Sequence, residues 1–206
     1  KAVVMATGSW VNRHVIRDLP ADLADACSKF QYAPFLVANV ALSNWRFLYK
    51  LGISAAIWDK AEGDFGYTCN IRNPMQVGDY QPPLDPDKPT VLSFYTPFYY
   101  PGLPVAAQGA MGRAELLTTS YKEYERKILA QMTKLFGSSG FDPQRDVAGI
   151  ILNRWGHAYS VPYPGFYGGK KDGAAPRDLL RKGYGRVAFG HSELDGLQHY
   201  GPAADE

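Results

Sequence analysis

The side chains best suited to chemistry lie in residues 153–169, directly after the apolar run at 147–152. That run predicts a buried strand. The segment that follows it gathers an arginine, a tryptophan, a histidine and three tyrosines among prolines and glycines. Polar and aromatic groups on such restrained backbone suit a pocket for a planar ligand, with Trp155, His157 and Tyr159 as candidate catalytic residues. The other interpretation, a tyrosine-rich loop that covers the core, stays open.

Asn39 is the next candidate. It is the one polar residue in the apolar run at 35–42, which predicts a strand, and it shares a face with Val37 and Ala41. A buried amide must find hydrogen-bond partners or face a pocket, and the sequence leaves both open.

Two strands end in residues that let the backbone approach a ligand. A strand over 3–6 is followed by Gly8, and a last strand over 185–190 leads into small and acidic residues. The residues at this second end are Gly190, His191, Ser192, Glu193, Asp195 and Gly196.

Several chemistries are excluded by spacing. The segment 190–194 resembles a nucleophile elbow, but Leu194 stands where the second glycine is required. The histidines show no close ligand spacing, so no metal site is predicted, and a site from His157, His191 and His199 is the weak alternative. No GxGxxG follows a strand, so the chain cannot complete a dinucleotide-binding unit alone.

Composition narrows the class of protein. Of 206 residues, 46% are hydrophobic and 20% charged, which predicts a packed core. The net charge of +2 argues against a nucleic-acid partner, and no apolar run reaches the ~20 residues of a transmembrane segment. We therefore expect a soluble protein of the cytoplasm or periplasm, with Cys27 and Cys69 as reduced thiols; one disulfide stays open.

Helical and strand patterns mix without a steady βαβ rhythm, so the sequence predicts an α+β fold with a mixed sheet and flanking helices. Leucines, tyrosines and other apolar residues three and four apart predict one helix over 113–136. Residues 63–79 are rich in Gly, Asn and Asp and predict a loop. The chain begins within a strand pattern and ends, at 202–206, on residues that suit a helix start, so we expect it to be part of something longer.

Taken together and in order, several segments resemble the flavin-dependent amine oxidase superfamily, most closely its bacterial spermidine dehydrogenase-like branch. These segments are 32–42, 44–46, 100–104, 112–115, 146–159 and 185–189. Together they span nearly the whole chain.

The resemblance implies a discontinuous FAD-binding domain whose N-terminal GxGxxG unit is absent from this chain. Residues 1–8 would be one return strand of that domain, 9–184 the substrate domain, and 185–206 the last FAD-contacting segment. The cofactor would be FAD, shared with the missing unit, and the partners would be a small amine and the remainder of the FAD-binding domain. The cofactor-binding residues implied are Gly8, Trp155, Gly190, Ser192, Glu193, Asp195 and Gly196.

The implied reaction is oxidation of a primary or secondary amine, with a polyamine among the candidates, by hydride transfer to the flavin. Tyr159 and Tyr167 would form aromatic walls of the amine site, which suit a cationic or neutral amine. Many relatives carry a lysine that holds a water beside the flavin, and this sequence places Asn39 near that position. The alternatives are a non-catalytic, aromatic-lined domain that binds a small ligand, or an inactive fragment.

Overall fold

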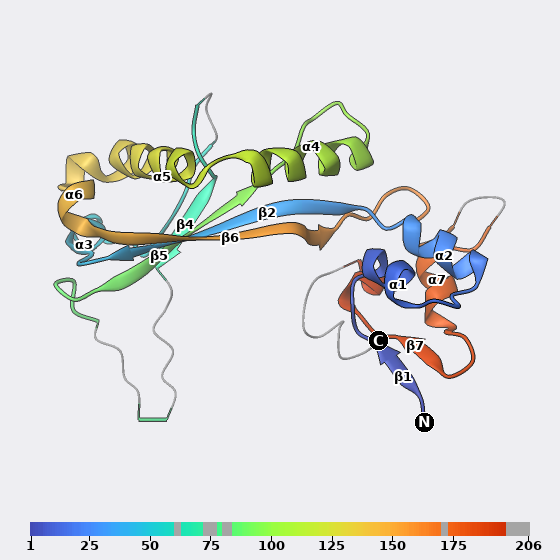
Figure 1. Cartoon of the computed structure of the whole chain (residues 1–206). Helices are drawn as coiled ribbons and strands as arrows, with labels where there is room; N and C mark the ends of the chain where they lie inside the picture. Colours follow the sequence, from blue (N-terminus) through green and yellow to red (C-terminus); the bar gives the residue numbers. More distant parts are fainter. Residues whose placement is uncertain (60–62, 72–77, 80–83, 170–172, 197–206) are drawn as a thin grey trace. The chain divides into compact units, whose positions relative to one another are not determined.

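The computed structural model describes residues 1–59, 63–71, 78–79, 84–169 and 173–196, and these form two compact units, each considered by itself (Figure 1). The first, which we call the helical unit, comprises residues 1–34, 99–112 and 156–206. The second, the sheet unit, comprises residues 35–98 and 113–155. The helix start predicted at 202–206 lies outside the described residues, and so does His199. Within the described residues, no helix has both the length and the apolar character needed to cross a bilayer.

The sheet unit is built on five strands in the order β3-β4-β5-β2-β6. Their bounds are β2 Tyr32–Leu42, β3 Ala55–Ile57, β4 Thr68–Ile71, β5 Thr90–Pro97 and β6 Val147–Ser160. Neighbours β2 and β5, β5 and β4, and β4 and β3 pair antiparallel. The short helices α3 (Arg46–Leu51), η1 (Gly137–Ser139) and α6 (Pro143–Asp146) complete this unit.

One face of the sheet packs against helix α5 (Tyr121–Phe136), which runs along it in Figure 1. Alternate residues of β2 point into this core: Leu36, Ala38, Val40 and Leu42 are buried. On α5 the buried hydrophobic residues recur every four positions: Tyr124, Ile128, Met132 and Phe136. The intervening residues of β2, including Asn39, lie on the opposite face and are partly exposed.

The single helix predicted over 113–136 is wrong, because the chain forms α4 (Val105–Thr118) and then α5. Ser120 ends the continuity: its backbone is extended and its hydroxyl accepts a hydrogen bond from the N–H of Glu123 at 3.2 Å. A serine that caps the next helix competes with helix continuation at that position. As a result Leu116 is fully buried, whereas Leu117, which begins the apolar spacing of the predicted helix, is 60% exposed.

Two strand predictions also change. The strand predicted to end at residue 152 continues as β6 to Ser160, so Trp155, His157 and Tyr159 lie on a strand and not in a loop. Pairing with β2 extends it, and the amide of Asn153 donates to the carbonyl of Val37 at 3.3 Å. The loop predicted over 63–79 contains β4, because its residues find a partner in β5.

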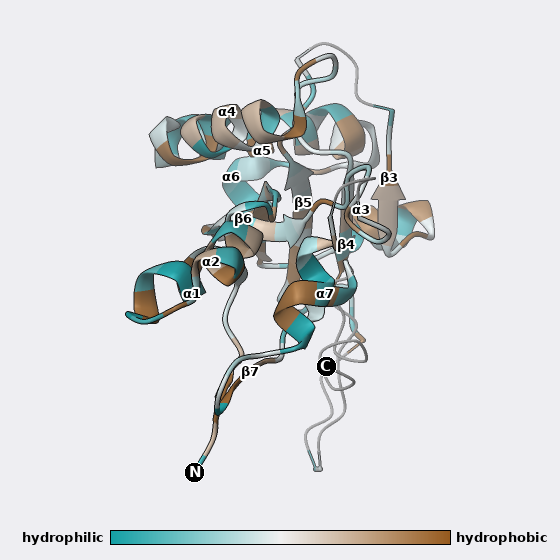
Figure 2. Ribbon diagram, turned by 90° about the vertical axis from the view of Figure 1, so that its right-hand side faces the viewer, coloured by the Kyte–Doolittle hydropathy of each residue, from teal (hydrophilic) through white to brown (hydrophobic). Residues whose placement is uncertain are grey.

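The helical unit holds α1 (Ser9–Val15), α2 (Ala21–Ser28), α7 (Pro176–Arg181) and η2 (Ser192–Asp195). Its core joins residues far apart in the sequence, with the hydrophobic turns of α7 brown in Figure 2. Its buried members are Leu23, Ala26, Cys27, Phe30, Tyr32, Phe166, Leu180, Phe189 and Leu194. Cys27 here and Cys69 in the sheet unit are free and buried, which confirms the prediction of two thiols.

The first and last predicted strands, β1 (Val3–Met5) and β7 (Val187–Phe189), pair in parallel as a two-stranded sheet. The two ends of the described chain therefore come together. The apolar run at the start of the chain is a buried-strand pattern, but Val3 and Val4 of β1 are 53% and 66% exposed. The α+β class of the prediction is confirmed, with helices and two sheets in the described residues.

Candidate functional site

A buried carboxylate organises the helical unit where β1 and β7 end. Glu193 is 1% exposed, and its Oε1 accepts from both the backbone N–H and the hydroxyl of Ser9, the latter at 2.5 Å. Its Oε2 accepts from the hydroxyl of Tyr32 at 2.8 Å. Because an ionised carboxylate is stable inside a protein only when donors surround it, these three bonds account for its burial.

The same carboxylate sets the ionisation of its neighbour. Burial, and next the negative charge of Glu193, raise the pKa of the Tyr32 hydroxyl far above its ordinary value, so the phenol keeps its proton and donates it. The Tyr32 oxygen in turn accepts from the N–H of Trp10 at 3.3 Å. Gly8 lies at the edge of this group: a Cβ there would be 3.1 Å from the Trp10 ring and 3.6 Å from Glu193 Oε2.

Two histidines border this cluster. The ring of His157, from β6, stacks on Trp10 with centroids 4.3 Å apart and meets Tyr32 edge-on at 5.3 Å. His191 accepts the N–H of Glu193 on its Nδ1 at 3.2 Å. That acceptor role requires Nδ1 to be unprotonated in this arrangement. The structure thus brings Gly8, His157 and Glu193 together from three distant segments.

Asp195, the other acidic residue predicted near the cofactor, lies at the surface. Its Oδ1 is 3.5 Å from Nη1 of Arg177 and 3.5 Å from Nη2 of Arg181, and its carbonyl accepts from the Tyr167 hydroxyl at 3.5 Å. Arg177 also lies over the Tyr167 ring, 4.8 Å from its centroid. Gly196, at φ +74°, needs the absence of a side chain, because a Cβ would come within 2.3 Å of the Tyr167 hydroxyl.

Gly190 and Ser192 contribute mainly backbone at this end of β7. The N–H of Gly190 donates to the carbonyl of Met5 at 3.1 Å, which continues the β1–β7 pairing by one residue. Ser192 begins η2 and is buried. The backbone after β7 is therefore held close to the backbone after β1.

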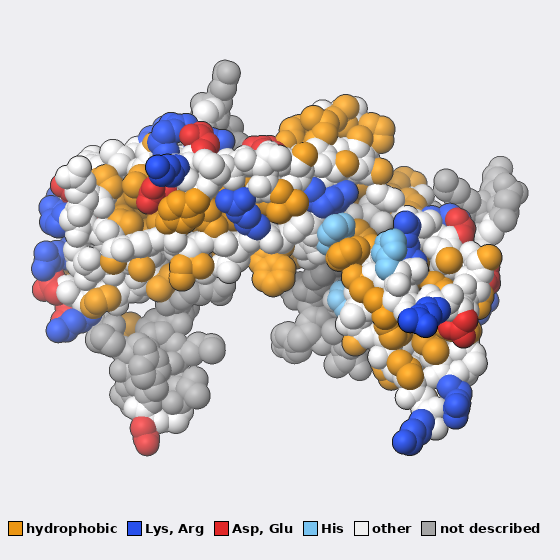
Figure 3. Space-filling view, in the orientation of Figure 1, with side chains coloured by type: hydrophobic (Ala, Val, Ile, Leu, Met, Phe, Trp, Pro, Cys, Tyr) orange, Lys and Arg blue, Asp and Glu red, His pale blue; other side chains and the backbone are white. Residues whose placement is uncertain are grey.

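Asn39 and Trp155 lie in the sheet unit, whereas Tyr159 lies on the part of β6 that belongs to the helical unit and is 45% exposed. Asn39 accepts the hydroxyl proton of Ser93, its cross-strand partner, on Oδ1 at 2.6 Å, and Asn70 lies opposite Ser93 on the next strand. The amide of Asn39 is thus bonded through its oxygen while its residue stays partly exposed. Trp155 is 58% exposed on β6. Figure 3 shows that hydrophobic side chains reach the surface on the face in view.

Sequence reasoning missed Ser9, Trp10, Tyr32 and Ser93 as partners of the site. Ser9 follows Gly8 directly, and a small polar residue after a strand-ending glycine was the available signal. The other three act through contacts that only the fold creates. Among the described residues, no group of His, Cys, Asp or Glu could hold a metal ion.

Known proteins match this chain in fold and not in sequence. No protein-family profile matches the chain, and no curated protein sequence does either. Among solved structures, the chain is similar to cyclohexylamine oxidase from Brevibacterium oxydans IH-35A, with a TM-score of 0.63 and 16% identity over 98% of this chain. It is also similar to a putrescine oxidase variant redesigned for cofactor binding, with a TM-score of 0.59 and 12% identity over 99% of this chain. The chain covers 39% and 42% of those two proteins, so it has the fold of about two fifths of an amine oxidase.

Proposed function

We propose that this chain is part of an FAD-dependent amine oxidoreductase, comprising its substrate domain and its last FAD-contacting strands. The proposal rests on one observation: nearly the whole of this chain shares its fold with part of each of two amine oxidases. The substrate would be a primary or secondary amine, with polyamines among the candidates and a spermidine dehydrogenase-like enzyme as the finer assignment. Residues 1–8 and 185–206 would belong to the FAD-binding domain and 9–184 to the substrate domain.

The residues present fit a flavin in part. FAD, when bound, would accept a hydride from the carbon that bears the amine. The exposed ring of Trp155 offers the flat apolar surface that an aromatic ring system packs against. The Glu193 carboxylate does not suit the pyrophosphate, because it is negative, buried and already bonded to Ser9 and Tyr32.

Glu193 would therefore act on the cofactor indirectly. By tying the start of α1 to the segment after β7, it holds the backbone of Gly8 beside that of Gly190 and Ser192. The N–H of Gly190 is already bonded to the carbonyl of Met5, so the N–H groups of Gly8 and Ser192 would be the ones to contact phosphate oxygens. In this proposal, backbone N–H groups contact the pyrophosphate, and the Glu193 carboxylate holds that backbone in position.

On the substrate side, the proposal assigns the amine contact to the open face of the sheet unit. The Ser93–Asn39 bond leaves the Asn39 amide nitrogen as a donor on that face, among Tyr95 and other apolar groups. A neutral amide in place of a lysine would hold a water or an amine nitrogen without adding positive charge. That suits a substrate which must be deprotonated before it is oxidised.

The proposed partner is the remainder of the FAD-binding domain. A parallel sheet is ordinarily covered on both faces, yet β1 and β7 stand as a pair with Val3 and Val4 exposed. A two-stranded sheet is marginal in water without further strands or a covering helix. Further strands of a nucleotide-binding sheet would bury this pair.

The test begins with the polypeptide purified from its native host, by intact mass and absorbance. We expect a flavin band that is bleached anaerobically by spermidine, putrescine or cyclohexylamine. A colourless protein that no amine alters would overturn the proposal. The 206-residue chain alone should hold FAD weakly, and a tight one-to-one titration of that chain would contradict the shared cofactor site.

Variants sharpen this test. Trp155→Ala should slow amine-dependent bleaching by about tenfold or more, because misplacing the reacting groups is costly. The matched control is Tyr49→Ala, an aromatic residue 66% exposed on α3 of the same unit. Equal effects of the two substitutions would remove Trp155 from the site.

A further inference from the structure

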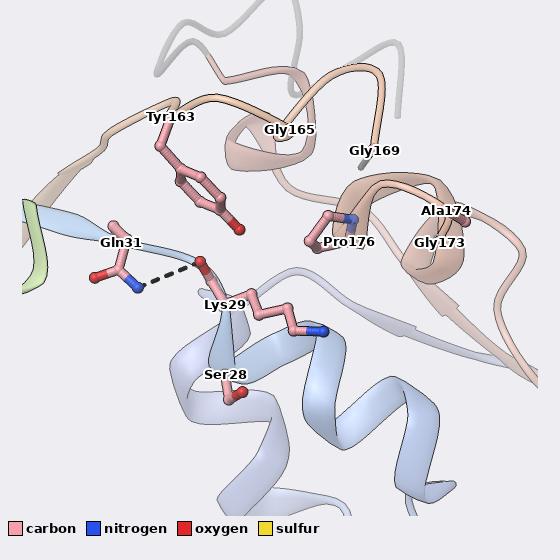
Figure 4. A pocket seen from close by; sticks show the side chains of 9 residues that line it. All are labelled: Ser28, Lys29, Gln31, Tyr163, Gly165, Gly169, Gly173, Ala174 and Pro176. Atoms are coloured by element: carbon pink, nitrogen blue, oxygen red, sulfur yellow. Dashed lines mark hydrogen bonds between the residues drawn. The ribbon is translucent and has the colours of Figure 1, made fainter. Parts of the chain in front are cut away.

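The helical unit contains a cavity of about 490 Å³ that the amine chemistry does not use (Figure 4). It lies between the end of α2, the start of β2, the loop at 163–169 and the start of α7. A volume of this size falls within the range of small-molecule sites, roughly 300–1,000 Å³. The described lining has one charged side chain, that of Lys29, and one aromatic ring, that of Tyr163.

Lys29 is a cation that a ligand can recruit. Its ammonium pairs with Asp25 one helical turn earlier, and the two side chains are 52% and 58% exposed. Such an exposed pair contributes only about 0–1 kcal/mol, so a ligand anion can replace or share Asp25 at little cost. Asp25 is not among the lining residues, but its carboxylate contacts the Lys29 ammonium, so an incoming anion competes with it for that cation.

Tyr163 and Gln31 supply fixed polar groups. The Tyr163 ring packs edge-on against Phe166, with centroids 6.0 Å apart, and Figure 4 shows its hydroxyl directed into the cavity. Gln31 donates from Nε2 to the carbonyl of Lys29 at 3.4 Å, which orients the amide beside the cavity. A ligand would thus meet one cation, one phenol, one amide and the hydroxyl of Ser28, which donates to the carbonyl of Asp25 at 2.6 Å.

The remaining wall is bare backbone and a proline ring. Gly169 has φ +71°, and a Cβ there would lie 2.3 Å from the carbonyl oxygen of Gly173, so only glycine fits. Without side chains at these glycines a flat ligand can approach the main chain closely. Pro176 adds an apolar surface across from Tyr163 (Figure 4).

We propose that this cavity binds a small planar molecule carrying one anionic group, a carboxylate or a phosphate. The anion is held by Lys29, and the flat body lies between Tyr163 and Pro176. The site is independent of the flavin, so the isolated chain should bind such a ligand whether or not it holds FAD. Lys29 provides the charge, while the glycines and the two rings select a flat body.

Binding is measured on the 206-residue chain by calorimetry with four probes. Benzoate and phenyl phosphate carry both features, benzamide lacks the charge, and inorganic phosphate lacks the flat body. We expect saturable binding of benzoate or phenyl phosphate, and the tighter of the two identifies the anion. Benzamide and inorganic phosphate should bind at least about tenfold more weakly, since each loses one contact. Equal binding of benzamide, or no binding of either aromatic anion, would overturn the proposal.

Two substitutions assign the contact to Lys29. Lys29→Gln should weaken the aromatic anion about tenfold, and Lys29→Arg should keep most of the affinity because it keeps the charge. The matched control is Lys50→Gln, an exposed lysine in the last turn of α3 in the sheet unit, which should change nothing. Unchanged affinity in Lys29→Gln, or equal loss in both glutamine variants, would contradict the assignment.

Discussion

Ser9 donates two hydrogen bonds to a single carboxylate oxygen of Glu193, one from its backbone and one from its hydroxyl, across 184 residues of chain. Both residues are 1% exposed. The contact closes the helical unit by joining the segment after β1 to the segment after β7. The contact therefore stabilises the helical unit and also holds Gly8 near Gly190.

The first prediction concerns this contact. Ser9→Ala should lower the free energy of unfolding by about 1–3 kcal/mol, because it leaves a buried carboxylate short of a donor. Urea unfolding, followed by far-UV circular dichroism, measures the change. Ser138→Ala, at an exposed serine, is the control and should be nearly neutral. A neutral Ser9→Ala would mean that the hydroxyl bond adds nothing to the bond from the Ser9 backbone.

The sequence pattern placed the strands β1, β2 and β7 close to their observed positions, because these elements follow local apolar runs. It failed at residues 113–136, where the apolar spacing continues through Ser120 but the serine side chain caps a new helix. It also ended β6 too early. Trp155, His157 and Tyr159 alternate as a half-exposed strand does, but their aromatic and polar character suggested a loop.

The candidate site was predictable only in part, for a physical reason. Gly8 and Glu193 each stand at a strand end that the sequence marks, and the parallel pairing of β1 with β7 brings those ends together. The partner Tyr32 comes from β2 and Trp10 from α1, and nothing in their local sequence points to a carboxylate 161 residues away from Tyr32. Side-chain contacts of such long range depend on the packed fold.

The second prediction is a pH dependence set by Asp146. The Asp146 carboxylate is 0% exposed and accepts hydrogen bonds from Arg145, Asn44 and the N–H of Asp142. These bonds, that from Arg145 above all, lower its pKa from 3.8 to about 2. Because the folded pKa is the lower one, the stabilisation is present above pH 3.8 and is lost as the pH falls toward 2. It amounts to about 2 kcal/mol.

Asp146→Asn tests this prediction in urea titrations at several pH values. The variant should be less stable at neutral pH and should lose part of the decline in stability between about pH 4 and 2. Asp59→Asn, at an exposed position of the same unit, is the control and should keep the wild-type profile. Identical acid profiles for wild type and Asp146→Asn would rule out this carboxylate as the titrating group.

The third prediction concerns the boundary between α4 and α5. Ser120→Ala should cost about 1 kcal/mol, because the N–H of Glu123 loses its acceptor, whereas Ser120→Asp should retain the cap. If residues 113–136 formed one continuous helix, alanine would instead be neutral or stabilising, because it has the highest helix propensity. Thermal unfolding of the two variants side by side distinguishes these outcomes.

The last prediction is that both cysteines resist alkylation in the folded protein. Burial, with Glu193 as the next contributor, raises the pKa of the Cys27 thiol to about 11, and burial raises that of Cys69 to about 12. The thiolate is the nucleophile, so at pH 8 few molecules carry Cys27 or Cys69 in the reactive form. Both side chains are also buried, so the reagent cannot reach them. Iodoacetamide followed by intact mass should show no label in buffer and two labels in urea. Rapid labelling of Cys27 alone in buffer would mean that the helical unit opens around Glu193 while the sheet unit stays closed.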